Sequence, residues 1–375
     1  MINKLFAVAA ATGIILSLAG SAPAHEDKKD SQPGQKAERT MAVDSHATIT
    51  LCVASGSLTV HGWDKSDVHV RSTDAEQLEF RRVDKTKDPN TPAMRVDVMV
   101  LDKTSRANPR LDCQAIADVE MDVPAGATVQ VQTRDGDINI AGVAAVYAGS
   151  QNGDITIERA AKLVEAGSVG GSISLRDSSG RVNLSSAGGG VEVSNLRGAT
   201  QDDTFEVGTV SGDIQLEGIA TPKVMAKTVS GTLKLTGALV KAGYYTFTNV
   251  TGNVVLELPR DASFRLNAKV NEKKDIVSEF PLKYLSEAAT TPPPVKTVPP
   301  PPGEKAPPPP AKEKGAAKDK TSKAAPPVEV IVGPVVVAKP AVIVPYVRRF
   351  EAVCGSGDAT ISVASFGGTI QLKKL

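Results

Sequence analysis

Aspartate follows glycine at several places in this sequence, a spacing that could build a row of carboxylates. The residues concerned are Asp137, Asp154, Asp213 and Asp358. Stacked in a row, such carboxylates could bind Ca²⁺ or act as the acids of a pectinase-like β-helix enzyme. Calcium-binding β-roll repeats need Gly-Gly-x-Gly-x-Asp, which only GSGD at Gly355 approaches. Because Asp is common in turns and equivalent phrases interrupt the row, we interpret these residues as ordinary turn aspartates. The interrupting residues are Ser172, Thr232 and Asn253.

The three cysteines are Cys52, Cys113 and Cys354. Cys52 and Cys113 both lie in the N-terminal β region and are the possible disulfide of an exported protein, with buried free thiols as the alternative. No two cysteines are close in sequence and none has a nearby histidine pair, which argues against zinc. We therefore expect no metal site.

Signals for catalysis are weak. All four histidines are N-terminal, no Ser-His-Asp arrangement can be assembled from the repeats, and a Gly-x-Ser-x-Gly elbow is absent from the sequence. The glycine-rich stretches GSVGGS at Gly167 and GGG at Gly188 precede strands, not a helix N-terminus, so we interpret them as turns and not as a phosphate cradle. We expect no catalytic residue and no cofactor.

A repeat sets the positions of the glycines and aspartates. TVSGDIQLEG begins at Thr209, and the similar TVSGTLKLTG begins at Thr228. In both, aliphatic residues stand two and four positions after the glycine, and this period of two predicts a strand with one buried face. The intervening polar residues would point outward, and the glycine would turn the chain at a positive φ.

The same pattern recurs along most of the chain. The predicted turn glycines are Gly136, Gly153, Gly171, Gly189, Gly212, Gly231, Gly252 and Gly368. The predicted core ladder comprises Ile138, Ile140, Ile155, Ile157, Ile173, Leu175, Val191, Val193, Ile214, Leu216, Leu233, Leu235, Val254, Leu256, Ile370 and Leu372. Gly56 begins a further copy with Leu58 and Val60.

A second strand lies between consecutive copies. Its buried positions are Val146 and Ala148, Val164 and Ala166, Val182 and Leu184, Phe205 and Val207, Val224 and Ala226, and Tyr245 and Phe247. A coil thus takes 17–23 residues, a period typical of solenoids, in which stacking joins the rows of adjacent coils into one core. The predicted fold class is all-β, a β-helix-like β-solenoid. A β-sandwich is the alternative, although sandwiches rarely keep a glycine at one offset through so many strands.

Composition and the two ends of the solenoid complete the domain prediction. Residues 1–24 form a signal peptide with an apolar run and a small-residue cleavage site, and residues 25–44 are polar and predicted to be disordered. We expect a secreted or periplasmic protein without a transmembrane segment after cleavage. With 43 Lys+Arg against 42 Asp+Glu, no nucleic-acid partner is expected.

Three signatures resemble the bacterial putative-adhesin family, a secreted domain of unknown function. SGSLTVHGWDKSDVHVRST resembles the family's opening strand pair, VEMDVPAGATVQVQTRDGDINIAG its next signature, and NGDITI and SGDIQL its repeated coils. The resemblance covers about residues 45–285 and again residues 348–375. It implies a β-solenoid fold and surface binding.

The sequence departs from the family pattern near its C-terminus. Residues 286–327 form a Pro/Lys-rich segment, predicted to be a disordered loop because it cannot build a core. Residues 328–375 are predicted to complete the solenoid. They comprise a proline-interrupted apolar edge strand and two terminal strands that carry Ile361, Val363, Ile370 and Leu372. We expect these terminal strands to cover the open end of the stack.

The leading functional hypothesis is a non-enzymatic binding or structural module at the bacterial cell envelope, with a cell-wall polymer, a surface glycan or an envelope protein as its partner. A carbohydrate-active β-helix enzyme is the first alternative, which a cleft with convergent carboxylates would favour. An envelope-stress sensor whose Pro-rich loop is recognised by a partner is the second.

Overall fold

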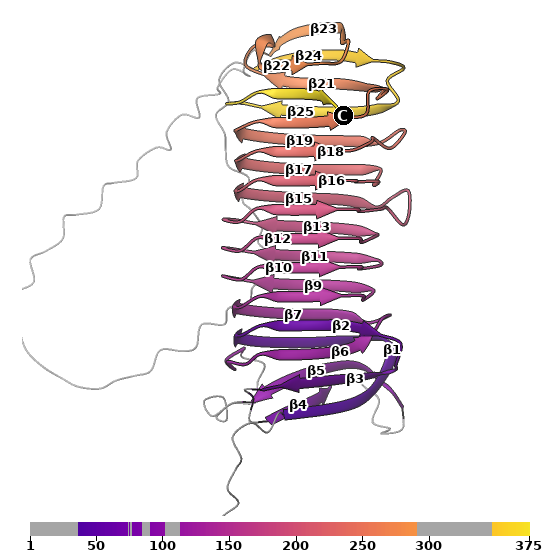
Figure 1. Ribbon diagram of the computed structural model, residues 1–375, viewed down its shortest axis with the longest axis vertical. Coiled ribbons are helices and arrows are strands. Elements are labelled where there is room, and N and C mark those ends of the chain that lie inside the picture. The colour runs from indigo at the N-terminus through magenta and orange to yellow at the C-terminus, as the bar shows by residue number, and fades with distance from the viewer. Residues whose placement is uncertain (1–36, 74, 76, 85–90, 102–112, 291–346) are drawn as a thin grey trace, which may run out of the picture. The chain divides into compact units, whose positions relative to one another are not determined.

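The computed structural model describes residues 37–73, 75, 77–84, 91–101, 113–290 and 347–375, which all belong to one compact unit. The predicted signal peptide, the Pro/Lys-rich segment from residue 291 onward and the predicted edge strand before residue 347 lie outside these residues. The described unit is an all-β solenoid of two long sheets, which confirms the predicted fold class (Figure 1).

Two strands from each coil enter two different sheets. Sheet A contains, in spatial order, the first part of β1 (Ala37–Ser55), β3 (Asp67–Ser72), β6 (Val119–Pro124), β2 (Leu58–Trp63), β8 (Ile138–Ala141), β10 (Ile155–Glu158), β12 (Ile173–Arg176), β14 (Val191–Ser194), β16 (Ile214–Glu217), β18 (Leu233–Thr236), β20 (Val254–Leu258), β26 (Ile370–Lys374) and β22 (Ile276–Ser278). Sheet B contains β4 (Gln77–Arg82), β5 (Ala93–Leu101), β1 (Ala37–Ser55), β7 (Thr128–Asp135), β9 (Ala145–Ser150), β11 (Leu163–Ser168), β13 (Arg181–Ser186), β15 (Thr204–Ser211), β17 (Lys223–Ser230), β19 (Tyr244–Thr251), β25 (Ala359–Ser365), β21 (Phe264–Val270), β24 (Val347–Cys354) and β23 (Lys283–Thr290).

The strands of both sheets alternate buried and exposed residues and enclose one apolar core. All sixteen residues of the core ladder are at most 3% exposed, and the inward positions of the return strands at most 8%. Equivalent residues pair in register from coil to coil: Ile155, for example, lies between Ile138 and Ile173. Three aromatic residues, Phe205, Tyr245 and Phe247, fill the sheet B side of the later coils.

The turn glycines form a ladder of very close contacts. A Cβ added to Gly171 would lie 2.1 Å from the carbonyl oxygen of Gly153, and one added to Gly368 would lie 1.7 Å from that of Gly252. A positive φ is found in this row only at Gly56, Gly231 and Gly252. The expectation that the turn needs positive φ at each copy is therefore wrong for most copies. Glycine is required there because the next coil approaches too closely for a side chain.

A buried row of polar side chains accompanies the glycines, three residues before each of them. Its members are Thr133, Ser150, Ser168, Ser186, Thr209, Thr228, Asn249 and Ser365. The Ser168 hydroxyl donates to the Gly153 carbonyl oxygen at 3.1 Å and accepts from the Gly171 amide at 2.9 Å. Ser150 and Ser186 make the same two bonds, and Thr209, Thr228 and Asn249 donate to the corresponding carbonyl oxygen, whereas the hydroxyls of Thr133 and Ser365 have no hydrogen-bond partner among the described residues. Because a buried backbone group without a partner is costly, the bonded members of this row stabilise the tight turn inside the core.

Spatial order departs from chain order at both ends of the stack. The coil of β1 and β2 lies between the coil of β5 and β6 and the coil of β7 and β8. The coil of β25 and β26 likewise lies between the coil of β19 and β20 and the coil of β21 and β22 (Figure 1). The expectation that the last two strands cover an open end is therefore wrong: they are internal.

The antiparallel strands β24 and β23 lie beyond β21 and end sheet B instead. Two predicted boundaries also shift. Residues 37–44, expected to be disordered, belong to β1 and pair with β3 and β5. Residues 286–290, expected to begin the disordered loop, belong to β23 and pair with β24.

A disulfide joins Cys52 of β1 to Cys113, with a Cα–Cα distance of 4.9 Å. It fixes the chain that follows β5 against the outer face of sheet B. Cys354 is a buried free thiol, and burial raises its pKa.

The glycine ladder predicts a position-dependent effect of alanine. Gly171→Ala should lower the free energy of unfolding by about 1–3 kcal/mol, as expected for overpacking. Gly149→Ala is the matched control, since its Cβ would meet no atom closer than 3.8 Å. Guanidinium denaturation measures the free energy of unfolding of both variants. Equal stability of the two would contradict the claim that the turn position requires glycine.

Removing the disulfide should also lower the free energy of unfolding. Replacing both Cys52 and Cys113 by Ser opens a loop with a sequence separation of 61 and should cost about 2–4 kcal/mol of unfolding free energy. Cys354→Ala provides a thiol-removal control without a bridge. A double variant no less stable than this control would show that the bridge does not stabilise the fold.

Candidate functional site

The aspartates that could carry chemistry are used to connect coils. Asp137 Oδ1 accepts a hydrogen bond from the Asp154 amide at 2.9 Å, and Asp154 Oδ1 accepts one from the Ser172 amide at 2.7 Å. Asp213 contacts the amide of Thr232 in the same way. Asp358 is not part of this row, because it precedes β25 of sheet B, not a strand of sheet A.

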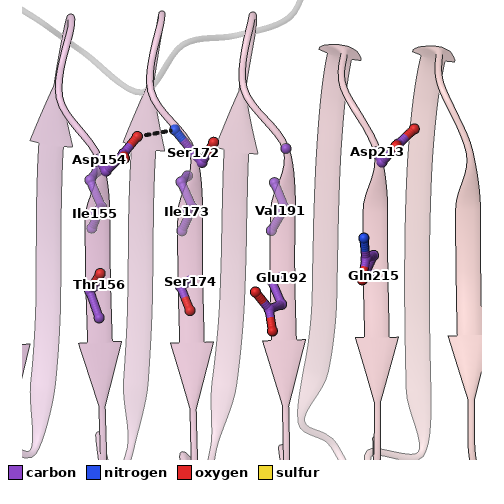
Figure 2. A pocket seen from close by; sticks show the side chains of 11 residues that line it. Asp154, Ile155, Thr156, Ser172, Ile173, Ser174, Val191, Glu192, Asp213 and Gln215 are labelled. Atoms are coloured by element: carbon purple, nitrogen blue, oxygen red, sulfur yellow. Dashed lines mark hydrogen bonds between the residues drawn. The ribbon is translucent and has the colours of Figure 1, made fainter.

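A shallow polar depression of about 260 Å³ lies beside this row on the outer face of sheet A. Figure 2 shows its floor: Thr156, Ser174, Glu192 and Gln215 form a line across β10, β12, β14 and β16. Gly190 takes the row position between Ser172 and Asp213, and its missing side chain hollows the surface. The depression contains carboxylates but is open and small.

The remainder of the outer face of sheet A is charged with both signs. Lys234 Nζ on β18 lies 3.0 Å from Glu257 Oε2 on β20. The hydrogen bond and charge of the Lys234 ammonium hold the pKa of Glu257 below its ordinary value, against the opposing effect of burial. Nearer the N-terminal end of the sheet, His69 Nε2 lies 2.6 Å from Glu38 Oε1, and His69 Nδ1 lies 3.4 Å from Asp122 Oδ2. The described charges of both signs are thus mixed on this face, and neither sign dominates it.

Sheet B has a larger groove on its outer face, with a volume of about 520 Å³. It crosses β1, β7, β9, β11 and β13 and is bounded at one end by the Cys52–Cys113 disulfide. More of its lining surface is apolar than polar, and the polar side chains among the described lining residues are mostly uncharged, with one carboxylate and one aromatic ring. The polar and aromatic lining residues include Thr50, Gln130, Gln132, Tyr147, Glu165, Asn183 and Ser185.

Glycines inside strands form the floor of this groove. Gly149 of β9 pairs with Gly167 of β11, which pairs with Ser185 of β13, and Gly208 of β15 continues the row. These glycines have no positive φ. A Cβ on Gly149 or Gly208 would meet no atom closer than 3.8 Å, and one on Gly167 would meet only the Ser185 hydroxyl at 3.3 Å. The fold therefore does not require glycine here, in contrast to the turn row.

Glycine within a strand weakens it and often marks a place where a ligand or another backbone approaches closely. The interpretation of Gly167 as a turn residue is wrong, because this glycine lies in β11. The signal was present in the sequence: AVYAGS and LVEAGS carry glycine at the same outward position of successive strands.

Within the described residues, no group of three or more His, Cys, Asp or Glu side chains could hold a metal ion. Among the same residues, no helix has the length and hydropathy needed to cross a bilayer. The buried thiol of Cys354 lies near the Ala262 carbonyl oxygen at the sheet B end of the stack, apart from both surface features.

Comparison with solved structures finds weak similarity. A putative adhesin from Parabacteroides merdae is 12% identical over 60% of this chain and 90% of its own, with a TM-score of 0.38. A putative cell adhesion protein from Clostridium sporogenes is 10% identical over 91% of this chain and 100% of its own, with a TM-score of 0.19. A putative adhesin from Parabacteroides distasonis is 13% identical over 60% and 91%, with a TM-score of 0.28. These scores support no functional conclusion.

No curated protein matches the chain significantly. A family model does match it, over residues 46–277. The matched range begins in β1 and ends in β22, so it includes every coil of the ladder except the C-terminal one. The chain belongs to the Toastrack DUF4097 family.

Proposed function

We propose that this protein is a non-enzymatic, exported binding module of the bacterial cell envelope, and that the groove on sheet B binds an extended, largely uncharged glycan strand. The observation that carries this proposal is the row of in-strand glycines, Gly149 and Gly167, in the groove floor. The fold does not need them, and they allow a ligand to approach the backbone of two adjacent strands.

The lining of the groove matches the chemistry of sugars. The amide side chains of Gln130, Gln132 and Asn183 supply both donors and acceptors, as the hydroxyl groups of a saccharide require. The Tyr147 ring adds an apolar surface with a polar tip at the same place. Glu165 is the only carboxylate among the described lining residues, so these residues give the groove little electrostatic attraction for a charged polymer.

The bonding of the row carboxylates favours binding over hydrolysis, because Asp137, Asp154 and Asp213 each accept a hydrogen bond from a backbone amide of the next coil. Asp154 and Asp213 precede β10 and β16, which are separated by three strand spacings, or about 14 Å. The two acids of glycosidases are about 5–9.5 Å apart. Asp137 and Asp154 lie on neighbouring coils, but the carboxylates of both bind backbone amides of the stack.

Export is supported by two independent features. The first 24 residues have the composition of a signal peptide, and a disulfide joins Cys52 to Cys113, which suits an oxidising compartment outside the cytoplasm. The envelope is thus where this module would meet a glycan polymer.

Filling the groove separates ligand binding from folding. Gly149→Thr should lower the affinity for the glycan at least tenfold, because the new side chain occupies the groove floor. Stability should stay equal or rise, since Thr favours strands and Gly costs about 0.5–1 kcal/mol inside them. Cosedimentation with purified peptidoglycan and binding to immobilised neutral oligosaccharides measure affinity, and thermal unfolding measures stability.

The matched control is Ser194→Thr, which adds a methyl group to the outer face of sheet A and should leave binding unchanged. A wild-type protein that binds none of these saccharides would overturn the proposed ligand. A Gly149→Thr variant that binds normally would overturn the proposed groove.

A further inference from the structure

The C-terminal coil occupies a slot that other parts of the chain complete on both sides. β25 pairs in parallel with β19 on one side and with β21 on the other. β26 pairs in the same way with β20 and β22. Among the described strands, β21 and β22 have no pairing with β19 and β20. In the two sheets, β25 and β26 thus join the coil of β21 and β22 to the body of the solenoid, whereas residues 259–263 make the covalent connection.

The slot recognises this coil through contacts that are specific to the repeat. Gly368 fits against the Gly252 carbonyl oxygen, where a Cβ would come within 1.7 Å. The Asn253 side chain accepts hydrogen bonds from the Thr369 amide at 3.1 Å and from the Thr369 hydroxyl at 2.9 Å. The Asn271 side chain, from the far wall, donates to the Phe366 carbonyl oxygen at 2.5 Å.

The coil also supplies its share of the core. Ile361 and Ile370 are fully buried, and Val363 and Leu372 are at most 2% exposed. By contrast, the coil of β21 and β22 turns through Asn271–Asp275 without a glycine. This coil therefore cannot continue the glycine ladder directly on Gly252. The slot selects a coil with the Ser365-to-Gly368 turn.

The covalent connection does not determine which copy of the coil fills the slot. Thr290 and Val347 are paired neighbours on β23 and β24, yet the 56 residues from 291 to 346 join them. That length could span on the order of 190 Å when fully extended. A second copy of the chain could thus provide the same coil and make the same contacts.

We propose that the slot between the coil of β19 and β20 and the coil of β21 and β22 is a strand-accepting site for β25 and β26, and that reciprocal exchange of residues 347–375, which carry β24 with them, joins two copies of the chain. Such exchange creates no new interface, so it is a low-cost route to a dimer, favoured by protein concentration. An empty slot would expose strand edges on both walls, which favours capture of the coil over its absence. This inference is independent of the glycan ligand.

The test uses the full chain with a protease site inserted between residues 291 and 346. After cutting, the C-terminal fragment should co-elute with the solenoid in size-exclusion chromatography. In mild denaturant a fluorescent peptide of residues 347–375 should exchange into the slot. A Gly368→Val peptide should bind at least tenfold more weakly, whereas a Lys373→Gln peptide, altered at an exposed position, should bind normally. Equal binding of both variant peptides, or no exchange, would overturn the site.

Refolding the full chain at high concentration tests the exchange. Light scattering should detect a dimer fraction that grows with concentration. Cutting the connection should convert this dimer into complexes of monomer mass, because only the connections join the two solenoids. A dimer that survives cutting, or a chain that stays monomeric at all concentrations, would overturn the exchange.

Discussion

The contact between a turn glycine and the carbonyl oxygen of the glycine one coil earlier is the constraint on which the rest of this structure depends. Parallel strands stack at about 4.8 Å, and the turn between the sheets must repeat at that spacing. A Cβ added to any glycine of the row from Gly56 to Gly368 would lie only 1.7–2.4 Å from a backbone carbonyl oxygen of the adjacent coil. No side chain can therefore be accommodated there. The buried polar row then bonds backbone groups at most of these turns, as Ser168 does, although the hydroxyls of Thr133 and Ser365 have no hydrogen-bond partner within the described part of the chain.

The same constraint explains how the two ends differ from the middle. A coil with the turn glycine can stack on another such coil, so Gly368 is accepted next to Gly252 although a long segment separates them in the chain. A coil without the turn glycine, such as that of β21 and β22, can lie only at an end of the stack. There the antiparallel strands β24 and β23 form the edge of sheet B. Because the inner faces and turns are fixed by stacking, the outer faces of the two sheets are free to vary. The groove in sheet B lies on such a face.

The sequence was sufficient for the fold class and the family, because a glycine followed by alternating aliphatic residues appears in nearly every coil. The order of the coils could not be predicted. The pattern at Ile370 and Leu372 identifies a coil, but nothing local shows that it inserts next to Val254 instead of following Ile276. The groove could not be predicted for a different reason: the glycine-rich stretch GSVGGS is interpreted as a turn because a strand follows it, yet its first glycine lies in β11. Only the register of the strands shows that Gly167 occupies an outward position of β11, whereas Gly171 contacts the preceding coil.

Cysteine cross-linking of three residues tests the intercalated coil most directly. Thr246, Ser362 and Asn267 lie in register on the outer face of β19, β25 and β21. In a background with Cys354 replaced by Ala, the pairs Thr246→Cys with Ser362→Cys and Ser362→Cys with Asn267→Cys should each form a disulfide, since adjacent strands satisfy its Cα spacing. The pair Thr246→Cys with Asn267→Cys should not, because two strand spacings, about 9–10 Å, separate these residues. Efficient bridging of this last pair, with failure of the other two, would contradict the stacking order.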